Sequence, residues 1–273
     1  MTTIILLYMG VGALAGVLAG LLGVGGGLII VPMVVFALSW QAAPQEHIMH
    51  LALGTSLASI MFTSISSFLA HHRRGAVQWQ VVRRITGGIL LGTFLGATLA
   101  SRLSTSVLKV IFVVFLYYMA WQLFSHSQPK ASRVLPGLWG LFWVGSGIGV
   151  VSSFVGIGGG SLSVPFMIWC NVPVHTAIGT SAAIGFPIAV AGAVGYLVNG
   201  LGVTALPPYS LGFIYLPALA GIVEVSVLTA PLGARLAHRL PVAQLRQGFA
   251  MLLLVMGTKM LAEVGEVLEV WGG

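Results

Sequence analysis

The sequence predicts an all-α polytopic membrane protein built from two inverted repeats. Three observations lead to this prediction: the apolar composition, a duplicated glycine motif and the distribution of basic residues. Of the 273 residues, 58% are hydrophobic and only 6% are charged, and aspartate is absent. Charged residues make up about 25% of an ordinary water-soluble domain. Windows of about 20 apolar residues, long enough to cross a bilayer as a helix, recur along the whole chain.

The composition also argues against several functional classes. The net charge of +7 comes from short basic clusters between apolar runs, a pattern typical of topology signals rather than of nucleic-acid binding. The single cysteine, Cys170, excludes an internal disulfide and a multi-cysteine metal site, and we interpret it as a small core residue. The sequence has no paired carboxylates and no metal-ligand spacing. We therefore expect no enzyme, no metal, no cofactor and no nucleic-acid partner.

Three short motifs occur twice and in the same order, which indicates an internal duplication. They are GVGGGLIIVP (23–32) and GIGGGSLSVP (156–165), HLALGTS (50–56) and HTAIGTS (175–181), and an LGA…RL pattern (95–103 and 232–240). We place the first repeat at 1–125 and the second at 137–273, joined by a cytoplasmic linker at 126–136. The first apolar segment lacks the basic start of a signal peptide, so we expect it in the mature protein.

Each repeat contains the same predicted elements. A glycine-interrupted hairpin is followed by three helices: 4–40, then 48–70, 85–103 and 107–125; and 137–171, then 174–198, 209–236 and 242–262. A continuous helix over 4–40 would be about 55 Å long, whereas the hydrocarbon core is about 30 Å thick. The glycine cluster is therefore a bend. Each hairpin is either two short spans or re-entrant, which gives about eight full spans plus re-entrant pieces, or about ten segments.

Basic residues predict the orientation. Most of the 12 lysines and arginines fall on one side of the predicted membrane: Arg73, Arg74, Arg83, Arg84, Lys130, Arg133, Arg235, Arg239 and Arg246. The positive-inside rule makes this side the cytoplasm, so both termini lie outside a multi-pass protein of the inner membrane. The helix at 48–70 then runs inward and its partner at 174–198 runs outward. Such inverted repeats are typical of secondary transporters, which bind substrate near the membrane midplane.

The duplicated glycine cluster is the main candidate binding site. Non-helical backbone at membrane depth is tolerated only inside protein or along a cavity. A helix that restarts after the bend, with Pro32 or Pro165 near its first turn, presents unpaired N–H groups that attract anions. We expect the two bends to face each other and to hold one small anion. The alternative is that the glycines only permit close helix packing. The candidate residues are Gly23, Gly25, Gly26, Gly27, Gly156, Gly158, Gly159, Gly160 and Ser161.

The GTS motifs supply further candidates. Their hydroxyls can donate to an anion and flank the site as two gates, or they can bond back to the helix backbone. These residues are Thr55, Ser56, Thr180 and Ser181. His50 and His175 precede the two motifs, and each is either a gate or ligand residue or an interfacial histidine that faces water.

Glu224 is the one acidic residue inside a predicted central span. A carboxylate at membrane depth is costly and suggests a functional role, and burial would raise its pKa. We therefore interpret Glu224 as a candidate for proton coupling. The alternative is a structural acid that is held by hydrogen bonds.

The segments GLLGVGGGLIIVPM and SSFVGIGGGSLSVPF, each followed by a GTS stretch, resemble the TauE/SafE family of membrane transporters over essentially the whole chain. The resemblance implies two homologous halves and the export of sulfite or small organosulfonates such as sulfoacetate. It also implies that the duplicated glycine, proline and GTS positions form the family motif.

We therefore expect a secondary transporter that exports a small sulfur-containing anion by alternating access. The alternatives are an anion channel of the same architecture and a proton-coupled importer of a small organic anion. The expected partners are the anionic substrate and the lipid bilayer, and a homodimer is one candidate assembly.

Overall fold

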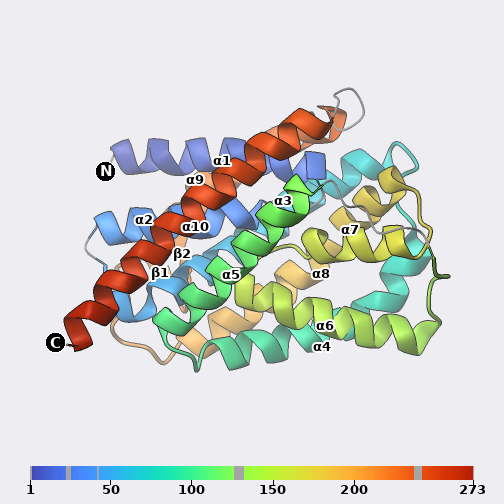
Figure 1. Ribbon diagram of the computed structural model, residues 1–273. Coiled ribbons are helices and arrows are strands. Elements are labelled where there is room, and N and C mark those ends of the chain that lie inside the picture. The colour runs from blue at the N-terminus through green and yellow to red at the C-terminus, as the bar shows by residue number, and fades with distance from the viewer. Residues whose placement is uncertain (1, 23–25, 42, 126–131, 237–241, 273) are drawn as a thin grey trace.

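The computed structural model is helical apart from one short β-hairpin (Figure 1), and it describes residues 2–22, 26–41, 43–125, 132–236 and 242–272. Glycine, proline and polar segments separate the apolar helices, as the sequence pattern predicts. In chain order the elements are α1 (Thr2–Leu22), α2 (Gly27–Trp40), η1 (Gln45–His47), α3 (Ile48–His72), α4 (Trp79–Ala100), α5 (Thr105–Phe124), α6 (Leu138–Val155), α7 (Gly160–Trp169), α8 (Val174–Gly200), β1 (Ser210–Leu211), β2 (Ile214–Tyr215), α9 (Leu216–Leu236) and α10 (Val242–Gly272).

Within the described residues, six helices are long and apolar enough to cross a membrane: Ile4–Leu21, Gln45–His72, Thr105–Phe124, Leu138–Val155, Val174–Gly200 and Leu216–Leu236. The apolar helices α2 and α7 are shorter. Many apolar side chains of these helices face outward. So much exposed apolar surface is unfavourable in water and suits a lipid bilayer. These findings support the prediction of an all-α polytopic membrane protein.

The helices run between two ends of the molecule. We call one the Tyr215 end, which carries the antiparallel β1–β2 hairpin, the start of α1 and the end of α10 on the left of Figure 1. We call the other the Arg74 end, which carries the loop from α3 to α4. In each half a long helix reaches the glycine cluster and a shorter one turns back: α1 then α2, and α6 then α7.

Helix packing joins the two halves crosswise. In the first half α1 packs along α9 of the second, and α4 packs along α6 in the same way. The central helices α3 and α8 pack against each other, and so do α5 and α10. Neither half therefore buries its apolar surface alone, and the two form one continuous core.

Glycines at four-residue spacing allow this close packing. A Cβ on Gly88 would lie 1.9 Å from the Phe142 carbonyl oxygen, and one on Gly92 would lie 2.1 Å from that of Ser146. In α1, a Cβ on Gly12 or Gly16 would lie 2.4 Å from a carbonyl oxygen of α9. Small residues at this spacing let membrane helices touch backbone to backbone. We did not predict these contacts, although the spacing is visible in the sequence.

Three predicted helix boundaries differ from the structure by six residues or more. The helix predicted from residue 209 begins at Leu216, because two prolines and the left-handed residues Tyr209 and Gly212 (φ 65° and 54°) turn the chain into the β-hairpin. The helix predicted from residue 85 begins at Trp79. Its early arginines are exposed and can reach water from a helix end. The last helix continues past 262 to Gly272.

Replacing Gly92 by valine should destabilise the protein, because the new side chain would push α4 away from the α6 backbone. Overpacking of this kind costs about 1–3 kcal/mol or more. The measurement is the thermal midpoint of the detergent-purified protein. Gly147→Val is the matched control, because the space around Gly147 is open. Equal losses in the two variants would contradict the close-packing role.

Candidate functional site

The two glycine breaks have the same local geometry. Gly26 precedes α2 with φ 76° and ψ −6°, and Gly159 precedes α7 with φ 75° and ψ −9°. Both values lie in the left-handed region, which costs a residue with a side chain about 1–2 kcal/mol. The sequence places glycine at both positions for this reason. Gly23 and Gly25, which we also predicted as site residues, lie outside the described residues.

The two breaks lie against each other. A Cβ on Gly27 would lie 2.2 Å from the carbonyl oxygen of Gly156 and 3.0 Å from the Cα of Ile157. The same Gly156 oxygen accepts a hydrogen bond of 2.7 Å from Ser56 Oγ in α3. The structure therefore brings together the predicted residues Gly27, Ser56 and Gly156, although they are far apart in the chain. Their role in binding an anion stays a prediction.

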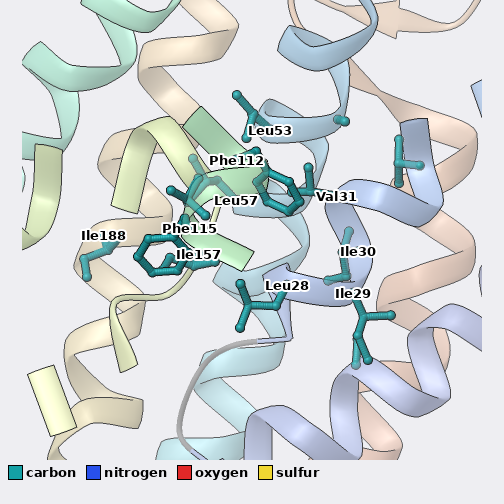
Figure 2. Close-up of a cluster of buried hydrophobic side chains, with 14 of the residues drawn as sticks. Leu28, Ile29, Ile30, Val31, Leu53, Leu57, Phe112, Phe115, Ile157 and Ile188 are labelled. Carbon is teal, nitrogen blue, oxygen red and sulfur yellow. The ribbon is translucent and has the colours of Figure 1, made fainter. Parts of the chain in front are cut away.

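Apolar side chains fill much of the space around this meeting point. Figure 2 shows them converging from α2, α3, α5, α8 and the segment between α6 and α7. They include Leu28, Val31, Leu53, Leu57, Phe112 and Ile157, all of which are fully buried. The polar groups that could hold an anion must therefore come from the backbone at the breaks and from nearby hydroxyls.

The start of α7 carries such polar groups. Leu162 and Ser163 donate their N–H groups to the Gly159 carbonyl oxygen at 3.0 and 2.8 Å. The N–H groups of Gly160 and Ser161 donate to no backbone carbonyl within the described residues. Ser161 is 3% exposed, and its Oγ also has no partner there. Unpaired N–H groups at a helix start attract negative charge, so this end of α7 can bind an anionic oxygen.

A second hydroxyl lies close to the same break. Ser152 Oγ, in α6, lies 3.5 Å from the position that a Cβ on Gly159 would occupy. It is fully buried and has no hydrogen-bond partner among the described residues. Buried hydroxyls are normally paired, so Ser152 and Ser161 are available to a ligand. We did not predict Ser152, since no motif distinguishes it from other serines.

The two breaks differ chemically. Ser163 Oγ lies 2.7 Å from Ser181 Oγ, within hydrogen-bonding distance. The first copy has Leu28 and Ile30 at the positions of Ser161 and Ser163. The start of α7 is therefore rich in hydroxyl groups, whereas the start of α2 is apolar.

The prolines lie deeper in their helices than predicted. Pro32 and Pro165 are inside α2 and α7 rather than in the first turn. A proline in a helix interior removes the N–H that would bond the carbonyl four residues earlier. The Ser161 carbonyl thus loses its usual helix donor, which increases the polarity of this short helix.

The threonines of the GTS motifs anchor the opposite half of the chain. Thr55 Oγ1 accepts the backbone N–H of Tyr215 at 2.9 Å. Thr180 Oγ1 accepts that of Gln78 at 3.0 Å. Each hydroxyl therefore holds the segment that leads into α9 or α4. The predicted alternative was a bond to the threonine's own helix, but these acceptor bonds reach across the molecule.

The glycines of the same motifs explain why these segments come so close. A Cβ on Gly54 would lie 2.2 Å from the Phe213 carbonyl oxygen, and one on Gly179 would lie 2.4 Å from that of Ala76. In both halves the glycine leaves room for the backbone of the other half, and the threonine that follows accepts a hydrogen bond from that backbone.

The two histidines have different surroundings. His50 is 2% exposed and stacks on Phe213, with ring centroids 4.9 Å apart. The backbone of Ala100 and Leu103 lies close enough to interact with its ring, although neither ring nitrogen makes a hydrogen bond of regular geometry within the described residues. His175 is exposed at the start of α8. A gate or ligand role for either histidine stays a prediction.

Glu224 is exposed on the outer side of α9. The expectation of a buried carboxylate is therefore wrong. Ile222 and Ser226, two residues away on each side, are buried instead. Because helical residues two apart face different directions, Glu224 points away from the core. Its location gives no support to proton coupling at the glycine breaks, and that role stays a prediction.

A hydrogen-bonded group closes the Tyr215 end near the end of α2. Gln41 Nε2 donates to the Tyr8 hydroxyl at 3.2 Å, and the Tyr215 hydroxyl donates to Gln41 Oε1 at 3.1 Å. Burial raises the pKa of the Tyr215 hydroxyl, so it stays protonated and able to donate near neutral pH. These residues line a pocket of about 350 Å³ whose rim includes Pro207 and Tyr209.

Substituting Thr55 by valine should lower the thermal midpoint, because the buried N–H of Tyr215 would lose its acceptor. An unsatisfied buried donor costs about 1–3 kcal/mol. Thr55→Ser keeps the hydroxyl and should remain close to the wild type. If Thr55→Val has an unchanged midpoint and alters only transport, then the hydroxyl serves a ligand and not the fold.

Comparison with known proteins identifies relatives along the whole chain. Residues 8–260 match the family model described as Sulfite exporter TauE/SafE. A probable membrane transporter protein of Haemophilus influenzae is 41% identical over 269 residues, 95% of this chain and 99% of its own. A probable membrane transporter protein of Methanocaldococcus jannaschii is 28% identical over 92% of this chain and 93% of its own. No solved structure matches the chain. The relatives are named as transporters and not as enzymes, and the chain belongs to the TauE/SafE sulfite exporter family of membrane transporters.

Proposed function

We propose that this transporter exports a small sulfur-containing anion, such as sulfite, sulfoacetate or a related organosulfonate, by alternating access. The description of its family as sulfite exporters supports the substrate class. The observation that carries the proposal is the contact between the two glycine breaks, beside the unpaired donors at the start of α7.

The donors at the α7 start suit a tetrahedral or pyramidal oxyanion. The N–H groups of Gly160 and Ser161 and the hydroxyls of Ser152 and Ser161 lie within about one helical turn of the break. Sulfite and sulfonate each present three oxygens that accept several hydrogen bonds at once. The opposite break, with Gly26 and Gly27, would contribute backbone and an apolar wall for the rest of the substrate.

None of the residues that we assign to this site carries a basic side chain. Lys109, the buried lysine, is paired with Glu263 at 3.1 Å between α5 and α10. The anion would be held by hydrogen bonds and the helix dipole alone. Binding of this kind is weak enough for rapid release, which a carrier needs on both sides of the membrane.

Equivalent hydrogen bonds in the two halves support an inverted-repeat mechanism. In α3, His71 Nε2 lies 2.9 Å from the Gly20 carbonyl oxygen, within hydrogen-bonding distance. In α8, the Tyr196 hydroxyl donates to the Ser153 carbonyl oxygen, also at 2.9 Å. We propose that the two halves exchange conformations by this symmetry. The site then opens first to one side of the membrane and afterwards to the other.

The distribution of charge supports export. Exposed arginines gather at the Arg74 end, which we assign to the cytoplasm of a cell with an inner membrane. Both termini then lie outside. A membrane potential of 100 mV, inside negative, drives a monoanion outward with about 2.3 kcal/mol, so export needs no coupling ion.

The proposal is tested with purified protein in liposomes loaded with sulfite, sulfoacetate, sulfate or taurine. We expect saturable efflux and counterflow of sulfite or sulfoacetate, with little movement of taurine. Channel-like flux without counterflow would contradict alternating access. If none of these compounds moves or binds, the substrate class is wrong.

Ser161→Ala should raise the KM for the transported anion about tenfold, because a hydrogen bond to a charged group contributes about 1.5–3 kcal/mol. Its thermal midpoint should not fall, since Ser161 Oγ has no protein partner among the described residues. Ser146→Ala is the control, because the Ser146 hydroxyl bonds back to the Phe142 carbonyl oxygen. An unchanged KM in Ser161→Ala would contradict a site at the start of α7.

A further inference from the structure

A pocket at the Arg74 end combines two arginines with two leucines. It has a volume of about 550 Å³ and is lined by Arg74, Leu232, Arg235 and Leu236. Arg74 comes from the loop after α3, and the other three come from the last turns of α9. The pocket therefore lies between the end of α9, a helix that can cross the membrane, and the basic loop after α3.

The arginines are positioned without a carboxylate to neutralise them. The Arg74 guanidinium donates from Nη1 to the Ala234 carbonyl oxygen, which fixes it beside α9. Neither arginine has an acidic partner within the described residues. Glu224 lies about 16 Å along α9 from Arg235. Glu263 is paired with Lys109 elsewhere.

The leucines continue into an apolar surface along α9. Leu228 and Leu232 are 71% and 49% exposed and are one helical turn apart. This surface faces away from α1 and α3, which cover the other sides of α9. The pocket thus presents positive charge at one end and an apolar strip that leads from it toward the membrane interior.

We propose that this pocket binds an anionic phospholipid. Its phosphate lies between Arg74 and Arg235, and one acyl chain follows Leu232 and Leu228. Arginine matches phosphate oxygens through parallel hydrogen bonds, and basic pockets at the cytoplasmic side of membrane helices bind anionic headgroups. A free anion would satisfy the arginines but leave the leucine strip without a partner, whereas a lipid covers both. The proposal does not depend on which substrate is transported.

The test uses the detergent-purified full chain titrated with phosphatidylglycerol or phosphatidylcholine. Binding is followed by the thermal midpoint and by native mass spectrometry of retained lipid. We expect phosphatidylglycerol to raise the midpoint more than phosphatidylcholine does. Arg235→Gln should raise the concentration for half the effect about fivefold, the contribution of one arginine at an anionic surface. The double variant with Arg74→Gln should lose the preference for phosphatidylglycerol.

Arg83→Gln is the matched control, because Arg83 is exposed near the same end but does not line the pocket. It should change the titration less than twofold. Equal losses in Arg83→Gln and Arg235→Gln would overturn the proposal in favour of a diffuse basic surface. Competition of inorganic phosphate or sulfite for Arg235, with no preference for phosphatidylglycerol, would overturn it in favour of a site for free anions.

Discussion

The structure depends on how the interrupted backbone at the two glycine breaks is accommodated among apolar helices. A broken helix exposes peptide groups that hydrocarbon cannot satisfy. Here one break covers the other: Gly27 lies against the Gly156 carbonyl, and Ser56 donates to the same oxygen. There is no room for a side chain at Gly27. The φ of 68° at Gly156 also favours glycine, so glycine is required on both sides of the contact between the two hairpins.

The crosswise packing follows from the same constraint. A hairpin with an interrupted backbone needs other helices to surround it, and each half supplies helices for the other. The long helix of each hairpin packs along the fourth helix of the opposite half, α1 on α9 and α6 on α4. Glycine-lined contacts make these interfaces closer than those that depend on large side chains.

The sequence predicts the helices and the bends but not most cross-chain contacts. Repeated motifs and apolar periodicity can be read directly from the sequence. The two hairpins and the positions of Gly26 and Gly159 could therefore be predicted. The acceptor role of Thr55 could not, because its partner Tyr215 lies in another half of the chain. The outward direction of Glu224 was predictable in principle. Small or apolar residues at four-residue spacing, including Ile222 and Ser226, already define the buried face of α9.

The contacts around α2 form a closed circuit that links the site to one end of the molecule. The α2 helix starts at Gly27, against Gly156, and Gly156 is bonded by Ser56. The neighbouring Thr55 holds Tyr215, which in turn binds Gln41 just after the end of α2. Both ends of α2 are therefore held by two adjacent residues of α3, through segments of the opposite half. The short helix α2 is thus held at both ends, and these contacts connect the Tyr215 end with the candidate anion site.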